Sequence, residues 1–463
     1  MTTPGGLQDI LPLSPLQEGL YFLSAYSGDG PDVYVVQQVL TLDGDVDAGR
    51  LRQAAQSLLD RHANLRAAFR PRKAGQPVQL IPHAVKADWT EIDLSDRPGD
   101  ADAVADEDRA KPFDLAKPPL LRWTLARLGA HRHRLILTSH HILLDGWSAP
   151  LLVRDLLLLY AGRPLPVVRP YKDYLAWVAG QDRAASERAW SEALAGIETP
   201  TIVGTGDPAV AAPQAVEHVV DAGRLAAAAR AEGLTLNTVV QGCWALVLAE
   251  LTGRDDIVFG STVSGRPATL PGAEDMVGLF INTVPVRIRP RPSDTWAGYL
   301  RRVQAEQAAL LDHQHVGLAT IQRLAGIGTL FDTLLVFESY PLDADGLRAL
   351  EDAAGLRLAE VTGADATHYP LTLTVIPGES LTLGAEYRAD VISREQATGL
   401  LSRLEALLAA FAADAGGRLA ALPAAGALRE AGPALDVPDG TILDEFDEVV
   451  RRTPDLVAVR FKD

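Results

Sequence analysis

Residues 133–148, HRLILTSHHILLDGWS, place two adjacent histidines at the end of an apolar, strand-like run and follow them with a charged turn. If residues 134–141 form a strand, successive side chains point to opposite faces, so His140 and His141 cannot share one environment. A turn through Leu144 to Gly146 would bring Asp145 back near the strand end, which favours His141. We expect His141 to face a reaction channel and His140 to be hydrogen-bonded inside the fold.

His141 is the candidate catalytic residue of this stretch, because a neutral imidazole is well suited to accept or direct a proton near neutral pH. Asp145 could orient that imidazole, as in a triad, or pair with a cation and brace the loop, and we favour the brace. Gly146 would admit a conformation or a substrate approach that a side chain would block. Taken alone, an HHxxxD pattern is more often a hydrogen-bonded core feature than a catalytic site. No metal site is predicted, since adjacent strand histidines point apart.

The composition is that of an ordinary globular protein, with 47% hydrophobic and 22% charged residues. A length of 463 residues predicts two core-bearing units and a remnant. The formal charge of −17 argues against a general nucleic-acid or acidic-membrane surface. Cys243 is the only cysteine, so no internal disulfide is expected. Without a secretory leader or an apolar run of about 18 residues, the sequence predicts a cytoplasmic protein with no membrane span.

The order of the predicted elements divides the chain into two α/β halves. In the first half, Asp47 is a candidate N-cap for an amphipathic helix running toward Phe69, and two adjacent strands follow, the second of which ends at the histidines. A proline-bearing connector and a long helical stretch place the boundary near residue 178. We therefore predict one lobe over residues 1–178 and a second over 179–430. Residues 431–463 read as a linker and the truncated start of a further domain.

Seven segments occur in the order found in the condensation domains of nonribosomal peptide synthetases, and the chain resembles that family over about residues 7–430. The segments are LPLSPLQEGLYF (11–22), RHANLRAAF (61–69), SHHILLDGWS (139–148), YKDYLAWV (171–178), VGLFINTVPVRI (277–288), LDHQHVGL (311–318) and LFDTLLVFESYP (330–341). FDEVVRRTPDLVAV (446–459) resembles the start of an adenylation domain.

This resemblance implies an α/β fold of two chloramphenicol-acetyltransferase-like lobes, arranged as a V-shaped pseudo-dimer with a central tunnel. It implies an acyltransferase that joins a donor thioester to the α-amine of an acceptor aminoacyl thioester. The substrates would arrive on phosphopantetheine arms of an upstream donor carrier protein and a downstream acceptor carrier protein, beside an adjacent adenylation domain. The domain itself would bind no cofactor. His141 would act as general base or as a group that positions the amine, with His140 in support.

By the same resemblance, Asp145 is the structural partner of an arginine. Arg287 is the first choice, and Arg266 and Arg66 are the alternatives. Gly146 and the backbone after it would lie beside the reacting thioester. The other residues expected near the tunnel and substrate are Trp147, Ser148, Asn282 and Thr283.

Finer details resemble the subclass that receives a donor with a D-configured C-terminal residue, among them THYPLTL (367–373). Residues 22–45 contain no histidine, so epimerase activity is not expected. Three alternatives stay open: a same-fold acyltransferase that uses coenzyme A or one carrier, an epimerisation domain, and a catalytically silent recruitment domain. The adenylation-like segment argues against the first two, and the intact signature from His140 to Gly146 argues against the third.

Overall fold

The computed structural model describes residues 6–26, 32–73, 75–204, 213–338, 344–419 and 451. The chain divides into two units, Met1–Ala424 and Ala425–Asp463, and each is considered by itself. The named helices and strands all belong to the first unit. The predicted linker and start of a further domain over 431–463 lie outside the described residues, apart from Arg451.

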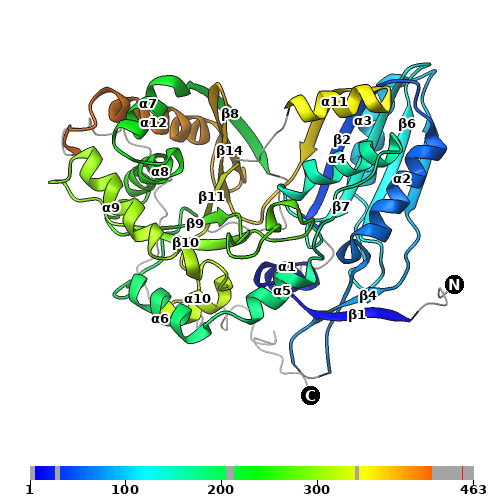
Figure 1. The fold of residues 1–463 in the computed structure, drawn as a ribbon. Coiled ribbons are helices and arrows are strands. Elements are labelled where there is room, and N and C mark those ends of the chain that lie inside the picture. Colours follow the sequence, from blue (N-terminus) through cyan, green and yellow to red (C-terminus); the bar gives the residue numbers. More distant parts are fainter. Residues whose placement is uncertain are drawn as a thin grey trace. The chain divides into compact units, whose positions relative to one another are not determined.

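Three sheets organise the first unit (Figure 1). The five-stranded sheet has the order β12(Leu356–Ala364), β2(Val35–Gly44), β7(Arg132–His140), β6(Leu121–Arg127) and β5(Asp88–Asp93). The six-stranded sheet has the order β10(Asn282–Ile288), β9(Ile257–Val263), β11(Thr333–Phe337), β13(Leu371–Pro377), β14(Ser380–Tyr387) and β8(Gln214–Asp221). A small sheet joins β1(Leu7–Pro12), β4(Val78–Pro82) and β3(Ala68–Arg70).

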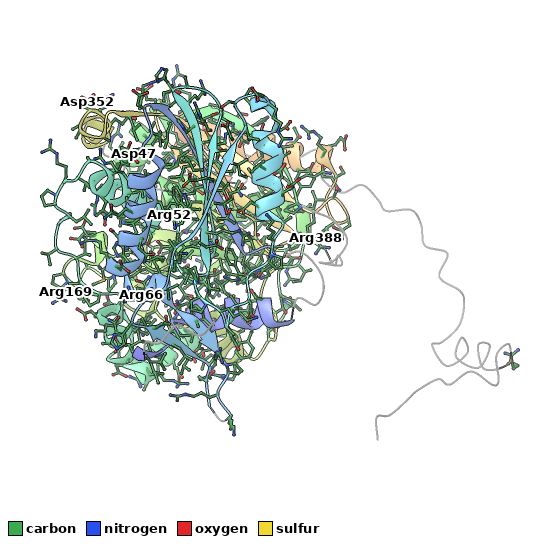
Figure 2. The ribbon with its side chains drawn as sticks, turned by 90° about the vertical axis from the view of Figure 1, so that its right-hand side faces the viewer. Asp47, Arg52, Arg66, Arg169, Asp352 and Arg388 are labelled. Carbon is green, nitrogen blue, oxygen red and sulfur yellow. The ribbon has the colours of Figure 1, made fainter. Side chains whose placement is uncertain are left out.

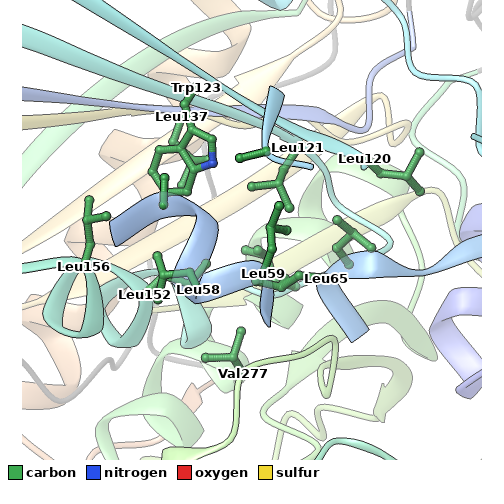
Figure 3. Close-up of a cluster of buried hydrophobic side chains, with 14 of the residues drawn as sticks. Leu58, Leu59, Leu65, Leu120, Leu121, Trp123, Leu137, Leu152, Leu156 and Val277 are labelled. Carbon is green, nitrogen blue, oxygen red and sulfur yellow. The ribbon is translucent and has the colours of Figure 1, made fainter. Parts of the chain in front are cut away.

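The central strand of the five-stranded sheet, β7, ends at the histidine pair. Leu135 and Leu137 of β7 join the core that α2(Ala48–Arg61) and α4(Ser148–Tyr160) also line (Figure 3). Asp47 caps α2, as predicted, because its side chain accepts a hydrogen bond from Arg50 N at 3.0 Å. The helix ends at Arg61 rather than running toward Phe69, and a 3₁₀ turn over Ala63–Arg66 follows it.

The remaining helices cover the sheets and the connections between them. Those of the first 200 residues are α1(Pro15–Tyr26), α3(Ala101–Arg109), α5(Lys172–Ala179) and α6(Arg183–Ala193). Those that follow are α7(Ala222–Ala231), α8(Leu236–Thr252), α9(Trp296–Ala308), α10(Leu318–Ala325), α11(Ala344–Ala354) and α12(Arg394–Ala413). Helices α7, α8 and α12 pack against the six-stranded sheet. Cys243 is buried in α8.

Two segments of the second half belong to the core of the first. Strand β12 pairs antiparallel with β2, from Leu356 opposite Gly44 to Ala364 opposite Gln37, and α11 contacts α4. Val277, from the connection before β10, packs into the core of the first half (Figure 3). A boundary near residue 178 therefore does not separate these segments from the first half, because each supplies apolar or pairing groups to it.

The described helices were also compared with the dimensions of a membrane. Among the described residues no single helix is long and apolar enough to cross one. The bent pair α7 and α8, at 103°, meets that length and composition only when both helices are counted together.

Candidate active site

His140, the last residue of β7, is fully buried and held from both ring nitrogens. Its Nδ1 accepts a hydrogen bond from Ile142 N at 3.1 Å, so the ring hydrogen lies on Nε2. Nε2 lies 3.1 Å from Asp32 Oδ2 and 3.1 Å from Ser24 Oγ. Burial opposes the ionisation of Asp32, but its hydrogen bond and attraction to His140 hold the pKa of this carboxyl below its usual value. These contacts tie His140 to the interior of the fold.

The His141 ring, unlike that of His140, is hydrogen-bonded through only one of its nitrogens among the described residues. Its Nδ1 lies 2.9 Å from Leu144 O, and because a carbonyl oxygen only accepts, Nδ1 carries the hydrogen. Its backbone N donates to Tyr34 O at 2.8 Å. Nε2 has no hydrogen-bond partner among the described residues, and the side chain is 15% exposed. A neutral His141 therefore presents the lone pair of Nε2 to an accessible space.

Asp145 is buried and uses both carboxylate oxygens for structural contacts. Oδ1 accepts from Ser148 N at 2.9 Å, Ser148 Oγ at 2.7 Å and Arg266 Nη2 at 3.1 Å. Oδ2 accepts from Phe280 N at 2.9 Å. No hydrogen bond joins Asp145 to His141 in the described part of the chain. Asp145 is thus a brace between the loop after β7 and the connection before β10.

The arginine that braces Asp145 is Arg266, and the first choice, Arg287, was wrong. Arg287 faces Asp256, with Nε and Nη2 lying 2.9 and 2.7 Å from its carboxylate oxygens. Arg66 donates to backbone carbonyl groups near the end of α2, and Figure 2 shows it beyond that helix. Arg287 lies on β10, whose hydrogen-bonded register places it opposite β9 and away from the loop that holds Asp145.

Gly265 explains why Arg266 reaches Asp145. Its φ is +61°, and a Cβ on it would lie 1.8 Å from Phe280 O, so only glycine lets these two backbone segments approach so closely. The next residue, Arg266, then lies with its guanidinium carbon 4.0 Å from the Phe280 ring centroid and 5.5 Å from that of Trp147. Local sequence contains no signal for this long-range contact.

The other predicted substrate-proximal residues make mainly structural contacts. Trp147 Nε1 donates to a backbone carbonyl of the 273–275 turn at 3.0 Å, and Ser148 is buried. Asn282 Nδ2 donates to two carbonyl groups of the loop before α10, at 2.8 and 2.7 Å, and Thr283 is buried on β10. Gly146 is half-buried and is not among the described glycines with positive φ.

Asp365, just after β12, was missed by sequence reasoning. Its Oδ2 lies 3.7 Å from Nε2 of His141. Nearby, Tyr34 Oη lies 2.7 Å from His368 Nδ1. Burial, followed by the charge of Asp365, raises the pKa of Glu386 on β14 to about 7. THYPLTL marked this segment in the sequence, but only the crossing of β12 brings it to the histidine.

Residues 7–424 match the family described as Condensation domain. The chain belongs to the condensation domain family of nonribosomal peptide synthetases. Condensation domains of this family are acyltransferases that form amide bonds. The predicted mixed α/β, chloramphenicol-acetyltransferase-like fold is confirmed.

Three similar proteins illustrate the relationship. The condensation domain is 36% identical over 488 residues to a linear gramicidin synthase of Brevibacillus parabrevis, and this match covers 99% of the chain but only 6% of that protein. The first condensation domain of the calcium-dependent antibiotic synthetase, in complex with substrate analogue 3a, aligns with a TM-score of 0.72 and 22% identity, over 89% of this chain and 98% of that chain. The starter condensation domain of rhizomide synthetase, in complex with C8-CoA and Leu-SNAC, aligns with a TM-score of 0.73 and 19% identity, over 89% and 96%. At these identities, the solved structures establish the fold alone.

Two cavities of the condensation domain adjoin the 311–314 segment. One of about 80 Å³ is lined by Arg266, Ile281 and Asn282 among others. The other, of about 200 Å³, lies among α8, β9, β10 and α9 and is lined by neutral amides, hydroxyl groups and apolar side chains. Within the described ranges, no group of three His, Cys, Asp or Glu side chains is placed to hold a metal ion.

Proposed function

We propose that this condensation domain forms a peptide bond between a donor acyl thioester on an upstream carrier and the α-amine of an aminoacyl thioester on a downstream carrier. Both substrates would arrive on phosphopantetheine arms, and the domain would bind no cofactor of its own. The observation that carries the proposal is the orientation of His141, whose Nδ1 is fixed by Leu144 O while Nε2 is left accessible.

The chemistry assigned to His141 follows from that orientation. An α-amine has a pKa of about 8, so most acceptor molecules are ammonium ions at neutral pH. Nε2 would take one proton, or hold the amine in place, while the amine nitrogen attacks the thioester carbon. The C–N bond forms, the C–S bond breaks, and the sulfur leaves as a thiol after protonation. Tethering both reactants supplies a further rate advantage of several kcal/mol.

The surrounding contacts support a rigid site. Asp145 and Arg266 join the loop of His141 to the connection before β10, and their side chains are 0% and 5% exposed. We assign His140 a supporting role in the same structure. Under this proposal the domain would have the V-shaped arrangement and tunnel of its family, with an adenylation domain following in the chain and a cytoplasmic location.

The donor is proposed to carry a D-configured terminal residue, because the motifs quoted above resemble that subclass. The test loads an upstream carrier with a D- or L-terminated peptidyl group and a downstream carrier with an amino acid, and follows the product by intact mass. We expect product with wild type, at a higher rate from the D donor. Equal rates from both donors would exclude the D-donor subclass, and no product from either donor would exclude peptide-bond formation.

A same-fold acyltransferase that uses coenzyme A is the second candidate, favoured by the starter domain in complex with C8-CoA. Its test replaces the donor carrier with an acyl-CoA in the same assay. We expect the carrier-bound donor to be used and the acyl-CoA to give little product. The reverse preference would assign the domain to this second class.

A further inference from the structure

Nε2 of His141 and Oδ2 of Asp365 form a pair of acceptors with no donor between them. They lie 3.7 Å apart, which is too long for a hydrogen bond. With Nδ1 of His141 donating to Leu144 O, neutral His141 has no hydrogen on Nε2, and a carboxylate has none either. Neither atom has another hydrogen-bond partner among the described residues, since Ala366 N donates to the other oxygen, Oδ1, at 2.8 Å.

A single nitrogen that donates two hydrogens can fill this gap. It would lie about 2.9 Å from each acceptor, the usual length of an N–H···O or N–H···N bond. A primary ammonium has three N–H donors and a positive charge that a carboxylate attracts. A hydroxyl group has one donor and no charge, so it can satisfy only one of the two acceptors.

The electrostatic surroundings favour a cation at this place. Burial, and then the charge of Asp365, raises the pKa values of two further carboxyl groups, Glu338 just after β11 and Glu386 on β14, so both are close enough to interact with Asp365. Asp365 itself is 62% exposed, so an incoming ligand can reach its oxygen without unfolding the segment. Among the described residues, no arginine or lysine forms an ion pair with Asp365.

We propose that Asp365 is a positioning residue for the acceptor, and that its Oδ2 and the Nε2 of His141 bind the same ammonium group. The pair then selects an acceptor that carries a primary amine over one that carries a hydroxyl group. This inference rests on the proposed function, and it names a residue that recognises the ammonium group of the acceptor.

The proton balance is complete with these groups. The ammonium passes one proton to Nε2, and the carboxylate of Asp365 stabilises the imidazolium so formed. The neutral amine attacks the thioester carbon, the C–N bond forms and the C–S bond breaks. The second proton of the nitrogen passes to the sulfur, and His141 returns its proton to water.

The test measures binding without turnover. A downstream carrier is loaded with an aminoacyl or a hydroxyacyl group of the same side chain through a non-hydrolysable pantetheine amide, and its binding to the full chain is followed by calorimetry at pH 7 without donor. We expect wild type to bind the amino form about tenfold more tightly, a value reduced from that of a buried charged hydrogen bond because Asp365 is exposed. Asp365→Asn is expected to bind both forms within about twofold, and Asp365→Glu to recover part of the preference.

Glu360→Gln is the matched control, because Glu360 is an exposed carboxylate on β12, five residues earlier. It should keep the wild-type preference. In turnover, Asp365→Asn should raise the acceptor KM more than it lowers kcat. The inference is overturned if wild type shows no preference, or if Asp365→Asn keeps it. If wild type makes peptide and Asp365→Asn has the same amine preference and acceptor KM, this inference alone is excluded. If wild type makes no peptide, the proposed function is excluded.

Discussion

Asp145 and Arg266 lie 121 positions apart in sequence and form an ion pair, with Oδ1 of the aspartate 3.1 Å from Nη2 of the arginine. Their side chains are almost completely buried, so water cannot solvate the remaining charge if the other residue is removed. The pair holds the loop that follows β7 against the connection before β10. The position of His141 therefore depends on a residue of the second half of the chain.

Arg266→Met should be strongly destabilising, because it leaves the Asp145 charge buried without its cation. We expect a loss of about 3 to 5 kcal/mol in the free energy of unfolding, measured by denaturant titration. Arg287→Met is the control. Its partner, Asp256, is 29% exposed and can be solvated, so the loss should be about 1 to 2 kcal/mol and the condensation rate nearly normal. A larger loss of activity with Arg287→Met than with Arg266→Met would contradict the assigned brace.

Substitution of His140 should mainly lower stability, and substitution of His141 should mainly lower activity. His140→Ala removes the partner of Asp32 and of Ile142 N inside the fold, and should lower the free energy of unfolding by about 2 to 3 kcal/mol. His141→Ala removes a partly exposed ring and should cost about 1 kcal/mol or less while it removes most of the activity. Thermal unfolding and amide formation, measured on both variants, check this. Equal stability losses in the two variants would be inconsistent with a buried support at His140 and an accessible base at His141.

Gly265→Ala should disrupt the approach of Arg266 to Asp145. The added methyl group would lie 1.8 Å from Phe280 O, and the backbone would also keep a positive φ, so we expect more than about 2 kcal/mol of destabilisation and loss of condensation. Gly326→Ala is the matched control, with a φ of +74° and no atom within 4 Å of the added Cβ. It should cost about 1 kcal/mol and leave activity unchanged. Similar effects from both substitutions would show that close contact with Phe280 is unimportant.

Glu386 should give the domain a pH-dependent stability. Its pKa is raised by burial, and then by Asp365, from 4.5 to about 7, so the unfolded chain loses this proton before the folded one. The contribution of Glu386 to stability is thus full below about pH 4.5 and is lost as the pH rises to about 7, with a total of about 3 kcal/mol at most. Glu386→Gln should be as stable as wild type at pH 4.5 and more stable at pH 8, by urea denaturation. No gain at pH 8 would argue against a buried, ionising Glu386.

Local patterns were sufficient for the parts of the fold that depend on neighbouring residues. Asp47 was identified as a cap because an N-cap is a local feature. The strand expected over residues 134–141 separated the two histidines, but β7 ends at His140 and His141 lies in the turn after it. The HHxxxDG signature also indicated Asp145 as a brace of its own loop, although it did not reveal the partner.

What the sequence could not supply are contacts between distant segments. Arg287 and Arg266 are both near motifs, and only the backbone approach at Gly265 decides which of them reaches Asp145. Asp365 carries no chemical signal of its own. It becomes part of the site because β12 crosses from the second half to pair with β2.

The central claim is that Nε2 of His141 serves the acceptor amine during amide formation. The most direct measurement is the single-turnover rate of amide formation between loaded donor and acceptor carriers, for wild type, His141→Ala and His131→Ala. His131 is an exposed histidine just before β7 and serves as the control. We predict a loss of about 10² to 10⁴ for His141→Ala and a wild-type rate for His131→Ala. A folded His141→Ala domain that forms the amide at the wild-type rate would contradict the account.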